Sequence, residues 1–361
     1  MRRISNFLFL LFSFFFLFSS FSSAQVGGTS VYNFLKIPTS ARSASTGGNL
    51  ISVNDTDFAL VIDNPSLINS GMHNHIMVNY INYVSDINLG YAAYARNFKY
   101  IGTVVAGLQY LNYGKFTQTN IYDEKIGEFS AGDYALNLSF AKKLHPQILS
   151  GGTIKGIYST LFENKSYGIA ADLASTFISK NNSFAAALVF KNMGAQIKTY
   201  SRNINELLPF EVQLGVSKKI KYAPIRIIFN LKNLQNWNLI SFQKINYPQS
   251  SQNNQTNKKA FDWGYNLVLH SSVGIELIPV KGFFLRLGYE PVKRREMELV
   301  NRSGLIGFSL GAGIRILKMN FSYARSSYHF AGASNHITLS TSISEFSSRK
   351  NNTVLFDQIN P

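Results

Sequence analysis

The histidines and acidic residues of the 361-residue chain are its best candidates for catalysis or metal binding, and they form no recognisable site. His73 and His75 stand two residues apart in "MHNH", a spacing that would place both on one face of a strand. A zinc site needs further ligands, and none cluster beside this pair in the sequence. We therefore interpret the two histidines as an ordinary surface pair.

Catalytic motifs are missing as well. Asp123, Glu124 and Glu128 share one polar stretch, which is typical of a solvated loop, whereas paired acids for hydrolysis need a defined cleft. The string "GFSLG" (307–311) matches GxSxG in letters, but it lies in a predicted strand with no helix to follow, so it does not form the strand–turn–helix elbow of a nucleophilic serine. The glycines of "GFSLGAGIR" (307–315) lack the GxGxxG spacing of a dinucleotide site. The sequence predicts a non-enzymatic protein with no cofactor and no metal.

The first 24 residues have the pattern of a signal peptide. Arg2 and Arg3 precede an almost unbroken Phe/Leu/Ser run over 4–21, and small residues at 22–24 offer a cleavage site before Gln25. The alternative is an uncleaved membrane anchor, because the run approaches spanning length. We expect cleavage and export.

Composition after export favours a membrane β-barrel in the outer membrane. The chain has no cysteine, so disulfides cannot stabilise it, and it contains 29 Phe, 19 Tyr, 26 Gly and only 9 Pro. Its formal charge is +16, but the lysines are scattered between apolar runs instead of forming one patch. We expect no nucleic-acid partner; lipid phosphates and acidic protein surfaces are the expected counter-charges.

Alternating apolar and small or polar residues predict the strands of that barrel. Residues 87–98 ("INLGYAAYARNF") and 166–178 ("SYGIAADLASTFI") alternate over a length that suits a tilted strand crossing a bilayer. Fourteen segments are predicted as strands: 75–84, 87–98, 100–112, 132–144, 147–160, 166–178, 183–192, 210–220, 225–234, 264–278, 281–290, 304–316, 317–326 and 335–343.

The connections between these segments alternate between short and long. Short, lysine-bearing turns alternate with longer polar stretches, which include 113–131, 193–209, 235–263 and 291–303. Bacterial barrels have short periplasmic turns and long outer loops, so we expect the long stretches outside the cell. A closed sheet leaves no backbone group unpaired in hydrocarbon. A soluble β-sandwich would explain the alternation but not the aromatic excess and the loop asymmetry together.

Four regions follow from this pattern: a signal peptide (1–24), an N-terminal segment packing at or in the barrel (25–74), the barrel (75–346) and a polar tail (347–361). The N-terminal segment is rich in small residues, which let backbones approach closely, and Gly47-Gly48 suits turns that other residues avoid. Arg42 is expected to anchor it by forked bonding to a luminal carboxylate or to carbonyls. Asn64-Pro65 predicts a turn and a helix start.

The N-terminal segment also carries a resemblance. Residues 25–69 resemble the start of the PorV/PorQ family of type IX secretion proteins, which are FadL-like fourteen-stranded barrels of Bacteroidota. The matching residues are Tyr32, Asn33, Phe34, Leu35, Pro38, Thr39, Ser40, Ala41, Arg42, Gly47, Gly48, Asn64 and Pro65.

The resemblance implies a non-enzymatic outer-membrane component that anchors a surface partner of the cargo attachment complex. The implied partners are a PorZ-like surface protein, the sortase-like PorU and the barrel PorV, together with lipopolysaccharide. Two alternatives stay open: a PorV-like shuttle that binds the C-terminal signal domains of cargo, and a FadL-like transporter of hydrophobic solutes. In the stretch 235–263, Trp237, Tyr247 and Trp263 are candidate anchors for a partner, because large aromatics dominate interfaces.

Overall fold

The computed structural model describes residues 30–201, 205–237, 239, 263–297, 304–329 and 332–347. The expected signal peptide and the tail after Ser347 lie outside these ranges. Tyr247 lies outside them as well. Among the residues described, no helix has both the length and the apolar character needed to span a membrane.

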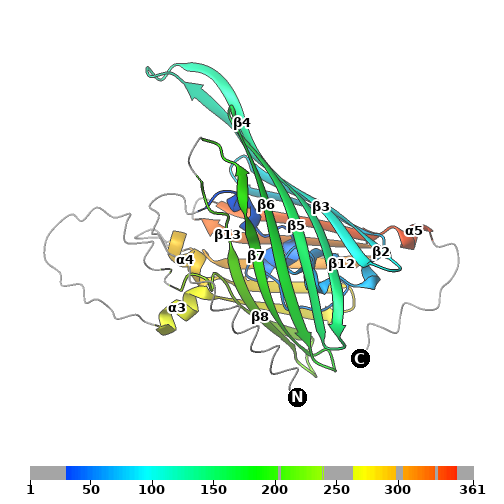
Figure 1. Cartoon of the computed structure of the whole chain (residues 1–361). Coiled ribbons are helices and arrows are strands. Elements are labelled where there is room, and N and C mark those ends of the chain that lie inside the picture. The colour runs from blue at the N-terminus through cyan, green and yellow to red at the C-terminus, as the bar shows by residue number, and fades with distance from the viewer. Residues whose placement is uncertain are drawn as a thin grey trace, which may run out of the picture.

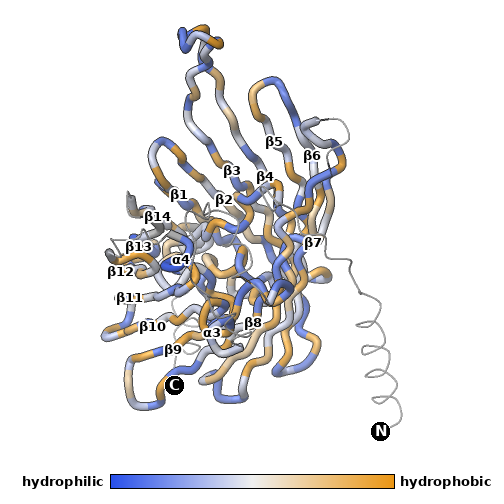
Figure 2. The backbone as a smooth tube through the Cα atoms, turned by 90° about the vertical axis from the view of Figure 1, so that its left-hand side faces the viewer, coloured by the Kyte–Doolittle hydropathy of each residue, from blue (hydrophilic) through white to orange (hydrophobic). Residues whose placement is uncertain are grey.

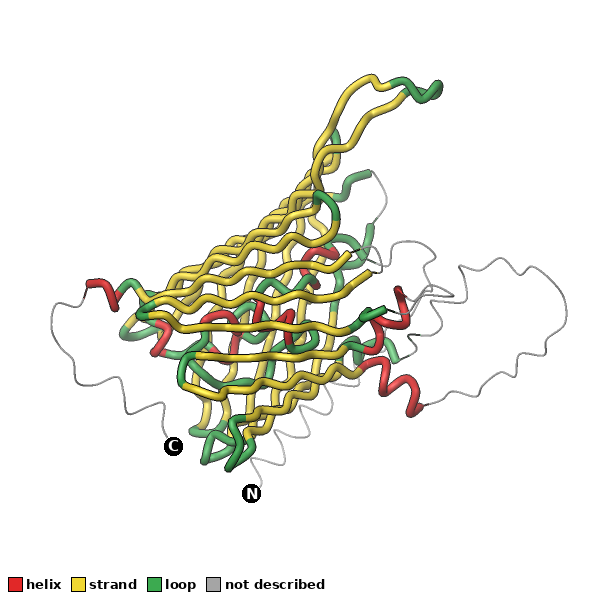
Figure 3. Tube along the Cα trace, turned by 180° about the vertical axis from the view of Figure 1, so that it is seen from behind, coloured by secondary structure: helices red, strands yellow, loops and turns green. Residues whose placement is uncertain are grey.

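Fourteen antiparallel strands close into one barrel, as the sequence predicts (Figures 1 and 3). Each strand pairs with its neighbours in sequence, and β1 closes the sheet by pairing with β14. The strands are β1 (His75–Val84), β2 (Ile87–Phe98), β3 (Gly102–Thr119), β4 (Lys125–His145), β5 (Ile148–Leu161), β6 (Asn164–Ile178), β7 (Phe184–Lys198), β8 (Glu211–Lys219), β9 (Ile225–Leu231), β10 (Ser271–Val280), β11 (Phe283–Tyr289), β12 (Phe308–Ile316), β13 (Met319–His329) and β14 (Gly332–Ser342).

The barrel has two unlike ends, here called the turn end and the loop end. The turn end carries the connections 99–101, 146–147, 179–183, 220–224, 281–282 and 317–318. The loop end carries 85–86, 120–124, 162–163, 199–210, 232–270, 290–307 and 330–331. Because β1 starts and β14 ends at the turn end, the helix α5 (Ser344–Ser347) also lies there, and α3 (Trp263–His270) and α4 (Pro291–Met297) lie at the loop end (Figure 3).

Two predicted segments differ most from the structure. Residues 264–270, predicted as strand, form most of α3, because β9 ends at Leu231 opposite Ser271 and offers them no pairing partner. A helix satisfies its own backbone groups without a neighbour. Residues 113–131, predicted as a long loop, instead extend β3 and β4 into a hairpin that projects from the loop end (Figure 1). Opposed pairs such as Phe116 and Phe129 stabilise this extension.

The outer wall of the barrel is apolar. Hydrophobic and hydrophilic residues alternate along the strands (Figure 2), and outward positions such as Val78, Leu136 and Ile169 are exposed. A row of tyrosines crosses four adjacent strands in register: Tyr110, Tyr134, Tyr158 and Tyr167. An apolar wall with an aromatic row is the surface expected of a barrel in a bilayer.

The N-terminal segment fills the barrel. It contains η1 (Asn33–Lys36), α2 (Ala41–Ser45), η2 (Phe58–Leu60), η3 (Pro65–Leu67) and η4 (Ser70–Met72), and most of its residues are buried. It enters from the loop end, where the Val31 N–H donates to Leu207 O, and reaches the turn end, where the Thr103 hydroxyl donates to Asn69 O. Residues 30–74 are called the plug below.

Candidate functional site

The barrel wall is shaped to receive the plug. Gly274, Gly288 and Gly311 lie on three adjacent strands, β10, β11 and β12, against residues 45–47 of the plug. A Cβ on Gly274 would lie 2.8 Å from Thr46 O, and one on Gly288 would lie 2.7 Å from the carbonyl carbon of Thr46. Only glycine lets the two backbones come this close, so these strand glycines make room for the plug.

Arg42 is positioned by a short helix inside the barrel. Ser40 caps α2 by accepting the N–H of Ser43, and the Ala41 N–H donates to the hydroxyl of Thr338 on β14. These bonds fix the first turn of α2 against the wall. As a result the Arg42 side chain, although charged, is almost completely buried.

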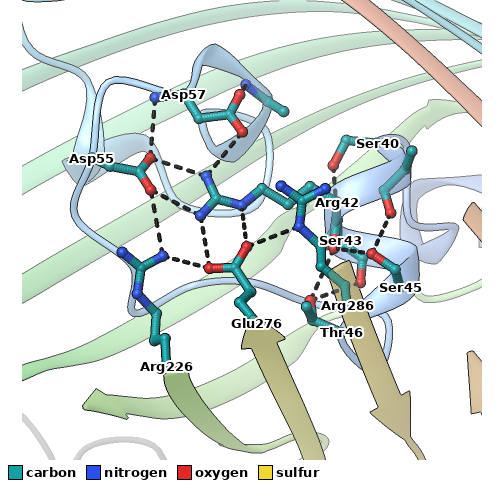
Figure 4. A network of polar contacts seen from close by, with 12 residues as sticks. Ser40, Arg42, Ser43, Ser45, Thr46, Asp55, Asp57, Arg226, Glu276 and Arg286 are labelled. Carbon is teal, nitrogen blue, oxygen red and sulfur yellow. Dashed lines mark hydrogen bonds and ion pairs between the residues drawn. The ribbon is translucent and has the colours of Figure 1, made fainter. Parts of the chain in front are cut away.

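All five N–H donors of Arg42 find carboxylate acceptors (Figure 4). Its Nε and Nη2 bind Glu276 on β10 at 2.7 and 2.9 Å. Its two Nη atoms bind the carboxylate of Asp55 at 3.0 and 2.8 Å, and Nη1 binds Asp57 at 2.9 Å. Asp55 and Asp57 belong to the plug itself, so Arg42 joins two parts of the plug to the wall.

Glu276 is the centre of this network. Its side chain is fully buried, and it accepts bonds from Arg226 on β9 and Arg286 on β11 as well as from Arg42 (Figure 4). Three arginines and three carboxylates therefore neutralise one another. Buried charges are tolerated only when they are paired and hydrogen-bonded in this way.

The arginines of this network lower the pKa of the partly buried Asp55. Burial would raise the pKa of its carboxyl, but Arg42 and Arg226 outweigh burial and hold that pKa below its ordinary value. Asp55 thus stays ionised in the folded protein, and its charge is used for structure.

A second network ties the plug to strands on another side of the barrel. Lys155 on β5 lies 2.7 Å from Asp172 on β6 and also donates to Asn192 on β7. In the plug, Asp63 accepts a short hydrogen bond from the Ser43 hydroxyl and lies 3.5 Å from Lys191 Nζ. The plug is therefore bound to the wall through separate charged contacts.

A third contact closes the plug at the loop end. Gly47 and Gly48 both have positive φ angles, of 89° and 86°, which other residues rarely adopt. Lys232 Nζ donates to Gly47 O at 2.7 Å and to Glu290 at 2.9 Å. Burial would raise the pKa of Glu290, but Lys232 and Lys293 bring it below its ordinary value.

The other motif residues pack or cap the plug. Phe34 and Leu35 belong to an apolar cluster with Leu111 of β3, and the Tyr32 hydroxyl bonds Ser166 on β6. Pro38, Thr39, Ser40 and Ala41 are buried, whereas Asn33 is exposed and bonds only Ser30 among the described residues. Asn64 caps η3, which begins at Pro65, by accepting the Ser66 N–H.

Two small cavities lie between the plug and the barrel wall. The two best-formed cavities of the described residues have volumes of about 10 Å³ each. One is lined by polar groups that include Thr39, Asn137 and Lys191, and the other lies beside Gly47 and Glu290. A cavity of about this size holds roughly one water molecule. Neither admits a hydrocarbon solute.

The hairpin formed by residues 113–131 is exposed, whereas the plug is buried. Its strands pair with each other, but pairing of β3 with β2 ends at Asn112, and pairing of β4 with β5 starts at Ala131. At its tip, Ile121 and Tyr122 are 91% and 78% exposed. The hairpin thus presents open strand edges and apolar side chains, which are features of a protein-binding surface.

The tryptophans of the predicted partner-binding loop lie at the same end. Trp237 stacks on Trp263 and on His270, with ring centroids 5.8 and 5.0 Å apart. Trp263 remains exposed, so it is the member of this stack that is open to contact. Tyr247 lies outside the described residues.

No metal centre forms in the part of the chain that the structure describes. The ring nitrogen Nδ1 of His73 accepts the Asn97 N–H, and His75 bonds the carbonyl of His73. The two histidines lie at the turn end. Among the residues that the structure describes, no carboxylate or further histidine joins them in a group that could hold a metal ion.

Sequence reasoning singled out Arg42 but not its partners. Arg226, Glu276 and Arg286 each interrupt an apolar strand with one charge, as in "VGIELIP" around Glu276. A lone charge at an inward position of a barrel strand is the signal that points to a luminal partner.

A scan against protein-family models finds no match, and a search of curated proteins finds no matching relative. Among solved structures, the Pseudomonas putida toluene transporter TodX is 12% identical, with 82% of this chain and 95% of that chain covered and a TM-score of 0.47. A Pseudomonas aeruginosa FadL homologue is 11% identical, with coverages of 84% and 97% and a TM-score of 0.44. The KdgM porin is 6% identical, with coverages of 74% and 99% and a TM-score of 0.33.

Proposed function

We propose that this chain is a non-enzymatic outer-membrane barrel that anchors a cell-surface partner of the type IX secretion machinery, as PorQ does. The filled lumen carries the proposal of an anchor. A plug held by three arginines and three carboxylates occupies the barrel, and the two cavities beside it hold about one water molecule each, which supports a barrel that serves as a fixed support.

The assignment to type IX secretion is supported by the N-terminal motif around Tyr32, Pro38-Ala41 and Arg42. The partner would dock at the loop end, on the hairpin 113–131 and beside Trp263. Open strand edges accept an extended segment of another protein, and exposed aromatics supply anchor points. Cargo processing would belong to a partner such as the sortase-like PorU.

The test removes the hairpin and leaves the barrel. Residues 115–129 are replaced by a two-residue Asn-Gly turn in the bacterium that encodes the chain. We expect a heat-modifiable barrel in the outer membrane, loss of the surface partner from detergent pull-downs, and release of unattached cargo into the medium. The matched control is Lys115→Gln with Lys125→Gln, which keeps the hairpin and its apolar tip.

Uptake of long-chain fatty acids and of toluene is measured in the same strains. Normal attachment of cargo with impaired uptake would contradict the anchor and favour the transporter. Direct capture of cargo signal domains by the purified barrel, without a surface partner, would favour the PorV-like shuttle.

A further inference from the structure

The turn end of the barrel is cationic all the way round. Five of its six connections contain a lysine, Lys99, Lys180, Lys221, Lys281 and Lys318, and the sixth, 146–147, follows Lys143 near the end of β4. The corresponding sequences, "FKYIG", "KKLHPQI", "ISKNNSF", "KIKYAPI", "VKGF" and "ILKM", contain no aspartate or glutamate. Because the sheet is closed, these lysines are distributed around a complete ring.

Large apolar side chains accompany the lysines. Tyr100 is 92% exposed, Tyr222 is 89% exposed and Leu317 is 92% exposed. Lys99 lies over the ring of Tyr100, with its Nζ 5.8 Å from the centroid, and Lys221 lies over Tyr222 at 5.2 Å. Each of these turns therefore presents a cation and an apolar group side by side.

The loop end differs in that its connections carry charges of both signs. They include the acidic residues Asp86, Asp123, Glu124, Glu163, Glu206 and Glu290, and also the basic residues Lys232, Lys293, Arg294 and Arg295. A general excess of lysine over the whole chain would not leave acidic residues out of one end alone. The cations of the turn end are therefore a local property of that end.

We infer that the turn end binds the phosphate headgroups of anionic phospholipids in the leaflet that surrounds it. The inference rests on the proposed placement of the barrel in a membrane. At a bilayer surface, the exposed Tyr100, Tyr222 and Leu317 would enter the boundary of the acyl chains, where amphipathic aromatics are favoured. The neighbouring lysines would then lie at the depth of the phosphates and attract negative headgroups.

The ring arrangement favours lipid over an acidic protein. A folded protein partner contacts one contiguous patch, whereas these lysines lie in or near six connections around the perimeter. Lipid surrounds a barrel completely. The cations also continue directly from outward apolar positions, since Phe98 precedes Lys99 and Phe177 lies three residues before Lys180.

The experiment measures lipid retention by the full barrel. Purified protein is reconstituted in vesicles of equal parts phosphatidylcholine and phosphatidylglycerol and then extracted in mild detergent. The mass of the intact protein–lipid complex is measured by native mass spectrometry, which gives the number of bound lipids. We expect the native chain to retain phosphatidylglycerol in preference to phosphatidylcholine. The triple variant Lys99→Gln, Lys221→Gln, Lys281→Gln should lower that preference by about tenfold.

The matched control is the triple variant Lys115→Gln, Lys165→Gln, Lys198→Gln, which removes three exposed lysines from the loop-end half of the barrel. Its lipid preference should equal that of the native protein. An equal loss in both triple variants, or no loss in the turn-end variant, overturns the inference. So does unchanged lipid retention combined with loss of an acidic periplasmic protein from pull-downs, which would identify a protein partner instead.

Heat-modifiability on gels is recorded for each variant and reports whether the barrel is folded. Failure of the native chain to insert into any vesicle would contradict the proposed membrane role itself. Insertion with equal retention of both lipids would contradict only the headgroup inference.

Discussion

The plug and the hairpin 113–131 both lie outside the regular barrel wall, and they have opposite environments. Most residues of the plug are buried inside the barrel, and the plug contains paired charges, such as Arg42 with Asp55. The hairpin projects from the loop end (Figure 1), and most of its contacts are between its own two strands. The plug places small and charged residues against partners in the lumen. The hairpin places aromatic residues in cross-strand pairs outside the barrel.

This difference in environment predicts a difference in energetic coupling. Removing one member of a buried charge network leaves the others uncompensated in a medium of low dielectric. Removing a residue from an exposed hairpin affects one or two cross-strand pairs, each of which contributes little. Changes in the plug should therefore destabilise the protein far more than changes in the hairpin.

The largest effect is expected for Arg42→Ala. The substitution removes five hydrogen bonds and leaves Glu276 and Asp55 with fewer positive partners. We expect the unfolding free energy in detergent to fall by about 3–5 kcal/mol and protease to cleave the plug while the barrel persists. Asn33→Ala, an exposed change in the same segment, is the control. Protease resistance equal to that of the native chain would contradict a structural role for Arg42.

A smaller loss of stability is expected when an added side chain displaces the plug from the barrel wall. In Gly288→Ala the new Cβ would meet the backbone of Thr46 and Gly47, which cannot move aside easily. We expect destabilisation of about 1–3 kcal/mol, measured by chemical denaturation. Gly156→Ala is the matched control, because a Cβ there meets no atom within 4 Å. Equal stability of the two variants would mean that the plug does not press against β11.

Acid should weaken the plug through Asp55. Its pKa is held below the ordinary value of 3.8, so its stabilising contribution is complete above pH 3.8 and is lost as the pH falls through the lower folded value. Glu290 shifts in the same direction from an ordinary value of 4.5. Denaturation midpoints measured from neutral to strongly acidic buffer should decline in this window. A midpoint that rises on acidification there would contradict the assigned ion pairs.

The sequence was sufficient for most of the wall. β1 and β2 begin and end at the predicted residues, and inward and outward side chains alternate through the middle of both strands. The prediction of strand at 264–270 was wrong, since alternation alone does not reveal whether a neighbouring strand is available. The hairpin extension depends on cross-strand pairs such as Lys115 opposite Ser130, whose register a single segment does not specify.

The luminal network shows where sequence reasoning ends. Arg42 stood out because a charge among small residues needs a partner. Its partner Glu276 lies 234 residues further along the chain, and only closure of the barrel brings β10 to that point. The small residues around Arg42 likewise gain meaning only from Gly274 and Gly288 in the opposing strands.

The smallest effect on stability, and the sharpest test of the two ends, comes from single cysteines. The natural chain has none, so each introduced thiol is labelled without background. Ile121→Cys, at the hairpin tip, should react with an impermeant maleimide on intact cells, and Tyr100→Cys, at the turn end, should react only after lysis. Both side chains are exposed, so each substitution should change stability by less than about 0.5 kcal/mol. Ser30→Cys should follow Ile121→Cys, because Val31 bonds Leu207 at the loop end. Labelling of Tyr100→Cys on intact cells would reverse the orientation, and with it the assignment of the hairpin to the cell surface.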